Sequence, residues 1–139
     1  MSKLEKHLIS SRECSKLVKN YDETIYREIN RSRPPSQPES KIYTLELEVL
    51  QDYLKMISEE MDKMGIKNKG VKINLGKYPD SSSDPKLDPD FLGYQMVFIS
   101  PADLDQKSQT ILDASSQGNL NRGVEDISNL NYMNISPPK

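Results

Sequence analysis

The sequence holds one histidine and one cysteine, two side chains that can act together as base and nucleophile when they lie within hydrogen-bond reach. His7 and Cys14 stand seven residues apart, on either side of the expected start of a helix. Even within one continuous helix this spacing corresponds to about 10 Å of rise, which is too far for proton transfer. We therefore predict no catalytic residue here and interpret Cys14 as a small core side chain.

Acidic residues gather in the segment DSSSDPKLDPD, from Asp80 to Asp90. Their carboxylates could in principle bind Ca²⁺ or Mg²⁺, but the spacing of Asp80, Asp84, Asp88 and Asp90 fits no compact ion-binding loop such as D-x-[DN]-x-[DN]-G. The serines and prolines between them are typical of a surface turn. We favour a solvated loop over residues 79–91 and expect no metal site and no cofactor.

The stretch Gly76-Lys77-Tyr78-Pro79 stands at the end of a predicted strand. Backbone N–H groups and the lysine could hold an anion there, which makes Gly76, Lys77 and Tyr78 candidate ligand-binding residues. A phosphate loop has several glycines and a following helix, and this stretch has a single glycine. The alternative, which we favour, is a simple turn that seats Tyr78 on the core.

A cluster of arginines, Arg27, Arg31 and Arg33, ends the first expected helix beside two prolines. Such a cluster could contact RNA or a proline-binding domain, but cations near a helix C-terminus are favourable without any partner. The whole chain has 19 basic and 21 acidic residues, for a net charge of -2. Because no strong field is present to attract polyanions, we expect no nucleic-acid partner.

The composition indicates a small intracellular protein. With 139 residues there is room for one core, and the hydrophobic content of 35% is low for a chain that is compact throughout. No apolar run approaches the roughly 18 residues of a membrane span, and Met1 to Ser11 lacks the apolar stretch of a secretory signal. A single cysteine excludes an intrachain disulfide. We expect a cytoplasmic location and no membrane association.

Two segments have the apolar period of a helix. Between Ser10 and Asn30 the apolar positions recur at steps of three and four, and Ser10 with Glu13 forms a capping box. A second pattern runs from about Glu46 to Met64, and Gly65 can close that helix in the left-handed conformation. The predicted core positions are Cys14, Leu17, Val18, Tyr21, Ile25 and Ile29 in the first segment, and Leu47, Leu50, Leu54, Ile57, Met61 and Met64 in the second.

The second stripe could also be a dimerising coiled coil, but it spans fewer than three heptads and is widened by Val49, Tyr53 and Met56. We favour a helix packed on the protein's own sheet. Between the two helical segments, RSRPPSQPES (31–40) contains three prolines and predicts an extended connector.

Two strands are predicted after the second helix, and a short β-prone piece, Ile42 to Leu45, precedes it. Val71, Ile73 and Leu75 alternate with polar residues, which predicts a strand with one buried face that breaks at Gly76. The run from Tyr94 to Ile99 is apolar at nearly every position, which predicts a central strand that ends at Pro101. The fold class is therefore α+β, with two long amphipathic helices packed on a small sheet of about three strands.

Residues 103–139 have only scattered apolar positions. We expect a compact domain over residues 1–102, able to fold alone, and a polar extension over 103–139 that is weakly structured or docked. A weak helix over Leu104 to Ala114 is one possibility, and the ending NYMNISPPK suggests extended chain.

The segment from about Lys41 to Pro101 resembles a family of small uncharacterised Bacteroidota proteins. The resemblance rests on a β-prone lead into an amphipathic helix, IYTLELEVLQDYL, on the turn at Gly65-Ile66, on the strand-end element Gly76-Lys77-Tyr78-Pro79 and on the closing strand MVFISP. Relatives often end in a proline-rich tail with cysteines, and this tail has none. The resemblance implies a fold and no established activity.

Two functional hypotheses follow. The first, which we favour, is a non-catalytic protein-interaction module with a protein partner. The alternative is a small ligand-binding or hydrolytic protein that uses the Gly76 turn and the Asp80–Asp90 loop. The sequence leaves the oligomeric state open and leans away from an enzyme, since no nucleophile stands with a base.

Overall fold

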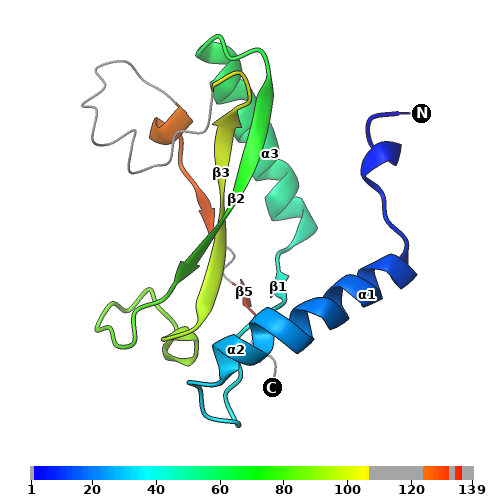
Figure 1. Ribbon diagram of the computed structural model, residues 1–139. Helices are drawn as coiled ribbons and strands as arrows, with labels where there is room; N and C mark the ends of the chain where they lie inside the picture. The colour runs from blue at the N-terminus through cyan, green and yellow to red at the C-terminus, as the bar shows by residue number, and fades with distance from the viewer. Residues whose placement is uncertain (1, 107–123, 132–133, 136–139) are drawn as a thin grey trace. The chain divides into compact units, whose positions relative to one another are not determined.

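The computed structural model describes residues 2–106, 124–131 and 134–135 (Figure 1). The chain divides into two compact units, one holding the described residues up to Glu39 and the other those from Ser40 onward. The α+β class predicted from the sequence is confirmed. No helix among the described residues is long and apolar enough to cross a membrane.

The first unit is mainly helical. A 3-10 turn, Glu5–His7, precedes α1 (Ser11–Tyr21), a π-helical turn (Asp22–Tyr26) and α2 (Arg27–Asn30). The predicted capping box is confirmed, because the Glu13 N–H donates to Ser10 Oγ at 3.2 Å and the Ser10 N–H donates to Glu13 Oε2 at 2.8 Å. The bond from the Ser10 backbone favours the ionised carboxylate and lowers the pKa of Glu13.

The predicted first helix therefore exists, but a π-turn interrupts its α-helical geometry. Its expected core side chain Cys14 is exposed, as are Leu17, Val18 and Ile25, so their prediction as core residues is wrong. The periodicity identified an apolar face correctly, and periodicity alone does not say whether anything covers that face.

The connector over residues 31–40 contains no helix or strand, as predicted. It returns toward the end of the helix, where the Glu39 N–H donates to Asn30 Oδ1 at 2.7 Å and the Tyr26 hydroxyl donates to the Glu39 carbonyl oxygen at 2.7 Å. The Arg33 guanidinium lies 3.8 Å from the Glu39 carboxylate. These contacts hold the end of the connector against the C-terminal end of the helical segment.

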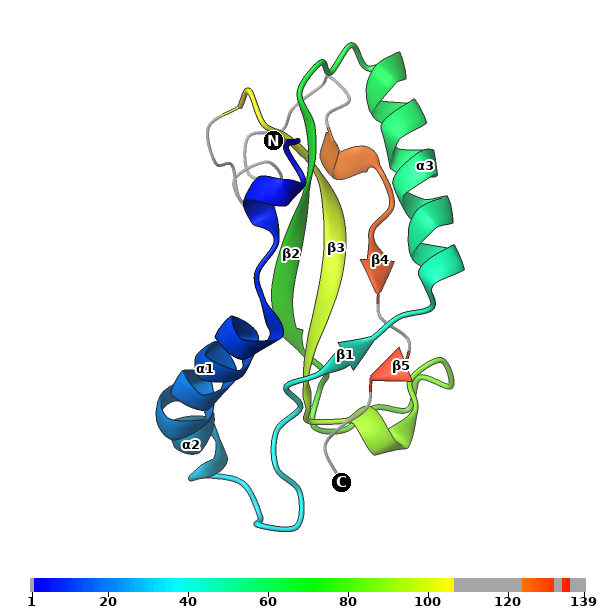
Figure 2. The ribbon, with the colours of Figure 1, turned by 90° about the vertical axis from the view of Figure 1, so that its right-hand side faces the viewer.

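The second unit contains two antiparallel sheets (Figure 2). One pairs β1 (Tyr43–Thr44) with β5 (Asn134–Ile135). The other has the order β2-β3-β4, with β2 (Lys69–Lys77), β3 (Gln95–Asp103) and β4 (Leu130–Asn131). The prediction that the strand around Tyr94 to Ile99 is central is confirmed.

Helix α3 (Leu47–Lys63) ends as the sequence predicted. Gly65 has φ +76°, and the Ile66 N–H donates to the Met61 carbonyl oxygen at 3.0 Å, the bond that defines a Schellman motif. Ile66 then packs against the core that contains Met61, so the helix end and the core are built from the same residues.

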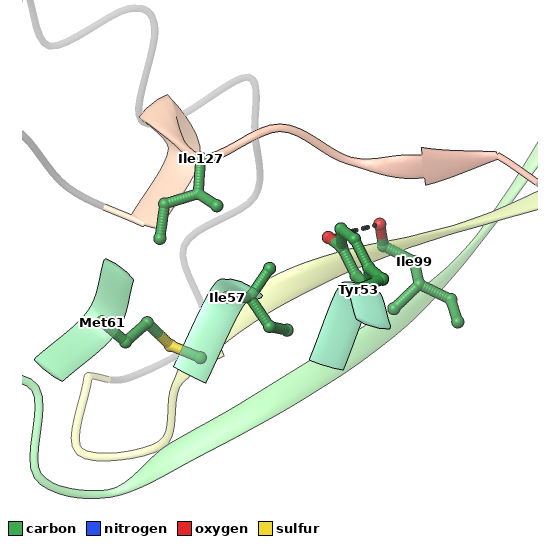
Figure 3. Close-up of a cluster of buried hydrophobic side chains, with 5 residues drawn as sticks. All are labelled: Tyr53, Ile57, Met61, Ile99 and Ile127. Atoms are coloured by element: carbon green, nitrogen blue, oxygen red, sulfur yellow. Dashed lines mark hydrogen bonds between the residues drawn. The ribbon is translucent and has the colours of Figure 1, made fainter. Parts of the chain in front are cut away.

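The core lies between α3 and one face of β3 (Figure 3). Partly buried side chains surround it, and the Tyr53 hydroxyl lies 3.2 Å from the Ile99 carbonyl oxygen and 2.9 Å from that of Ser128. Its buried members are Tyr53, Ile57 and Met61 of α3, Ile99 of β3, and Ile127. The helix thus packs on its own sheet, as favoured over a coiled coil.

Residue Ile127 belongs to the polar extension that we expected to follow the domain. It is buried, and β4 pairs with β3 through the partners Phe98–Asn131 and Ile99–Leu130. This part of the extension is therefore integral to the second unit. The possible helix over Leu104 to Ala114 lies mostly outside the described residues. In the ending NYMNISPPK, the described residues Asn131, Asn134 and Ile135 are in strands, as expected for extended chain.

Several predicted burial states and boundaries in the second unit are wrong. Leu47 and Leu54 of α3 are exposed, whereas Tyr53, which was expected only to widen the stripe, is buried with Ile57 and Met61. Strand β2 continues through Gly76, and β3 continues through Pro101 to Asp103. Pro101 faces Val71 in the ladder at a pair that needs no N–H from β3, and such a position tolerates proline.

Candidate functional site

The sequence candidates for nucleophilic chemistry lie on exposed helical surface. His7 is in the 3-10 turn and Cys14 in α1, and both are exposed. Within the described ranges, no group of three or more His, Cys, Asp or Glu side chains has a geometry that could hold a metal ion.

The candidate ligand-binding residues Gly76, Lys77 and Tyr78 lie at the end of β2. Gly76 pairs with Met96 in the β2–β3 ladder, and the Met96 side chain packs over it, with its sulfur 2.9 Å from the position that a Cβ would take. The Lys77 ammonium lies 2.9 Å from Asp80 Oδ1. The Asp80 carboxylate therefore already pairs with the Lys77 ammonium, the group that would have to attract an anion.

Tyr78 is buried, which agrees with the favoured interpretation that this stretch seats Tyr78 on the core. Its N–H donates to the Tyr94 carbonyl oxygen at 3.0 Å, its ring stacks on Phe91 and its hydroxyl lies 3.3 Å from Asn131 Oδ1. These contacts connect the end of β2 to the loop and to β4.

The aspartates of the Asp80–Asp90 loop accept local hydrogen bonds. Asp84 Oδ1 accepts from the Lys86 N–H and Asp88 Oδ1 accepts from the Asp90 N–H, both at 2.9 Å. Bonds of this kind are typical of Asx turns, which agrees with the interpretation of this segment as a turn region.

Two residues of the arginine cluster have partners within their own unit. Arg31 pairs with Glu28 at 3.2 Å, and the Arg33 Nε donates to the Gln37 carbonyl oxygen at 2.8 Å. A hollow of about 490 Å³ beside the π-turn is lined by Thr24, Ile25, Arg27, Glu28 and Ile29. The charged groups of this lining are the Arg27 guanidinium and the Glu28 carboxylate, so the hollow lacks the two carboxylates that acid–base catalysis by a carboxylate pair requires.

The most distinctive surface of the second unit is on β2. Val71, Ile73 and Leu75 point to the same face of the sheet as their cross-strand partners Pro101, Ile99 and Val97. Those partners are buried, whereas Val71, Ile73 and Leu75 are 45%, 69% and 72% exposed. We call these three β2 side chains the apolar strip.

The apolar strip is exposed because α3 covers only part of its sheet. Figure 2 shows α3 running beside β4, near the edge of the sheet that is farther from β2. The helix and β2 approach each other at one end, where the Lys69 ammonium lies 2.6 Å from Ser58 Oγ and 2.8 Å from Asp62 Oδ1. Away from this polar contact, α3 packs on Ile99 of β3, and its core contacts do not include Val71, Ile73 or Leu75.

Sequence reasoning found the apolar alternation of β2 but assigned the wrong surroundings to it. One signal pointed to an edge strand, namely the lysines that stand at both ends and near the middle of KGVKINLGK. Lysine on a strand is a common protection of an exposed edge.

Comparison with models of known protein families, with curated proteins and with solved structures found no match.

Proposed function

We propose that this protein is a non-catalytic protein-interaction module and that it binds its partner through the apolar strip of β2. The observation that carries the proposal is the exposure of Ile73 and Leu75, at 69% and 72%, on an ordered nine-residue strand. Contiguous exposed apolar side chains on a rigid sheet mark binding surfaces in many proteins.

The energetics favour binding at this position. Fully burying an aliphatic side chain of this size contributes about 1.5–3 kcal/mol. The strip is held by a continuous ladder to β3, so little backbone entropy remains to be lost when a partner covers it. A partner at this surface gains apolar contact with the exposed side chains of Val71, Ile73 and Leu75.

The alternative of a ligand-binding or hydrolytic protein gains no support from the same residues. Lys77 is paired with Asp80, and Gly76 lies within a strand where it packs on Met96. The resemblance to the small Bacteroidota proteins and the packing of the N-terminal helix on the sheet stay predictions.

The experiment is affinity capture from a cell extract with the full chain and two matched variants. Ile73→Ser removes the centre of the apolar strip, and Lys72→Ser changes the neighbouring residue on the opposite face. We expect the proteins retained by the natural chain to be lost with Ile73→Ser and kept with Lys72→Ser, with both variants melting within a few degrees of the natural protein. Equal retention by all three chains would contradict the proposal.

A further inference from the structure

Along β2, the backbone N–H and C=O groups of successive residues point alternately toward β3 and toward the outer edge of the sheet. At the two ends of the ladder, the Tyr78 N–H donates to the Tyr94 carbonyl oxygen at 3.0 Å and the Leu104 N–H donates to that of Asn68 at 2.9 Å. Since hydrogen-bonded pairs alternate in an antiparallel ladder, the even-numbered β2 residues bond to β3. The N–H and C=O groups of the odd-numbered residues, from Lys69 to Lys77, therefore point to the outer edge.

The same odd-numbered residues carry the apolar strip, so one set of residues presents both the edge hydrogen-bonding groups and the exposed apolar side chains. Within the part of the chain that the structure describes, β3 is the only strand paired with β2. The outer edge can thus accept a further strand along its whole length.

The sequence of β2, KGVKINLGK, is close to a palindrome about Ile73. Reversal exchanges Lys69 with Lys77 and Gly70 with Gly76, and it exchanges Val71 with Leu75. In an antiparallel pair of two such strands centred on Ile73, each apolar residue would face an apolar residue and Lys72 would face Asn74. Self-complementarity of this kind is the requirement of a two-fold interface.

The charged residues at the two ends of β2 are also compatible with this antiparallel pairing. Lys69 would face Lys77 of the other copy, but each lysine already has a carboxylate beside it, Asp62 at 2.8 Å and Asp80 at 2.9 Å. Each end of the interface would therefore hold two ammonium groups and two carboxylates. Repulsion between the facing lysines is compensated.

We propose that a second copy of this chain pairs its β2 with this β2, antiparallel and about a two-fold axis at Ile73. This inference rests on the proposed function and deepens it, because the pairing joins two three-stranded sheets and doubles the apolar strip. The hydrogen-bonded pairs are Ile73 with Ile73, Val71 with Leu75, and Lys69 with Lys77.

Other two-fold registers are poorer. Centring the pair on Lys72 places two lysines directly opposite each other, and centring it on Asn74 places the apolar Val71 opposite Lys77. Each step away from Ile73 also shortens the shared ladder. The Ile73 register alone uses all five edge-facing residues.

Single-cysteine cross-linking tests the register. In the full chain with Cys14→Ser, we expect Ile73→Cys to form a disulfide-linked dimer on mild oxidation, since facing Cα atoms would be about 5.5 Å apart. The single variants Lys72→Cys and Asn74→Cys are controls. In either one, the two copies of the cysteine would be diagonal to each other, on residues about 8 Å apart, and should cross-link at least tenfold more slowly than Ile73→Cys. A mixture of these two variants should link to each other. Equal or faster linking of either control with itself would overturn the register.

Sedimentation of the full chain tests the association itself, and we expect a dimer at micromolar concentration. Ile73→Pro removes an N–H that points to the outer edge and no bond to β3, so it should weaken the dimer by about tenfold or more and leave the circular dichroism spectrum unchanged. Ile73→Thr keeps the N–H and should weaken the dimer less. A natural chain that is monomeric at 100 μM by sedimentation would overturn the pairing, and the cross-linking result stands as an independent test if the proline variant fails to fold.

The two proposals fail separately. A monomeric chain that still loses its captured partner with Ile73→Ser would overturn the dimer and keep the interaction module. A dimer that captures the same proteins with and without Ile73→Ser would keep the pairing and overturn the apolar strip as a partner site.

Discussion

Ile73 and Ile99 face each other across the β2–β3 ladder and point to the same face of the sheet, yet one is 69% and the other 4% exposed. The side chains are identical and their backbones are similar. The difference arises because α3 and Ile127 cover β3 and leave β2 open. Burial in this protein is thus set by where the covering segments lie, and alternation along a strand reports only which face is apolar.

The largest effect should come from removing the segment that covers β3. A chain ending at Gln106 lacks Ile127 and β4, and it removes the Ser128 carbonyl near the Tyr53 hydroxyl. We expect this chain to lose cooperative unfolding of the second unit in thermal denaturation followed by circular dichroism. A truncated chain that melts cooperatively at the temperature of the full chain would show that Ile127 is dispensable for the core.

Alanine at each of the two facing isoleucines tests the comparison directly. Ile99→Ala leaves a cavity in the core and should lower the free energy of unfolding by about 2–5 kcal/mol. Ile73→Ala should change it by about 0.5 kcal/mol or less in the monomer, because little apolar area is lost. Urea denaturation at low protein concentration measures both. Equal losses would mean that β2 is covered as fully as β3.

Tyr53→Phe should have a smaller effect, about 1 kcal/mol, through loss of the hydroxyl's hydrogen bond to a main-chain oxygen. Burial raises the pKa of Tyr53, so the native state holds this proton more tightly than the unfolded state. The free energy of unfolding should therefore fall as the pH rises through and above the usual range of tyrosine.

Denaturation of the natural and Tyr53→Phe chains across alkaline pH measures this effect. The phenylalanine variant should lose part of the alkaline slope, and an unchanged slope would assign that slope to other groups.

The smallest effect is expected in the first unit, where Ser10→Ala removes the cap of α1. Both capping bonds involve exposed groups, so we expect a loss of helix content limited to the start of α1. Because Ser10 lowers the pKa of Glu13, the cap's contribution in the natural chain should be present near neutral pH and be lost as the pH falls through that lowered pKa. Amide exchange near Glu13, compared at neutral and acidic pH, measures both changes. A variant with natural protection at Glu13 would exclude the capping box as a stabilising element.

Local patterns predicted the elements of this fold. The capping box at Ser10, the left-handed Gly65, α3 and the central position of β3 all follow from residues near one another in the chain. These features depend on backbone preferences and side-chain period, which a sequence displays directly.

The contacts between distant segments could not be predicted in the same way. Ile127 enters the core 70 residues after Ile57, from a segment whose composition suggested a polar extension. The candidate site on β2 was missed for the same reason, since exposure of Ile73 depends on the placement of α3. The strand's palindromic sequence was visible, but its meaning depends on knowing that β2 is an outer strand.

Residue-resolved amide hydrogen exchange on β2 tests the central claim most directly. The amides of Lys72 and Asn74 point to β3 and should be protected at every protein concentration, while those of Val71, Ile73 and Leu75 point to the outer edge. We predict that the outer-edge amides are protected at high concentration and exchange rapidly on dilution. Rapid exchange of these amides at all concentrations, or protection that does not change on dilution, would contradict the account.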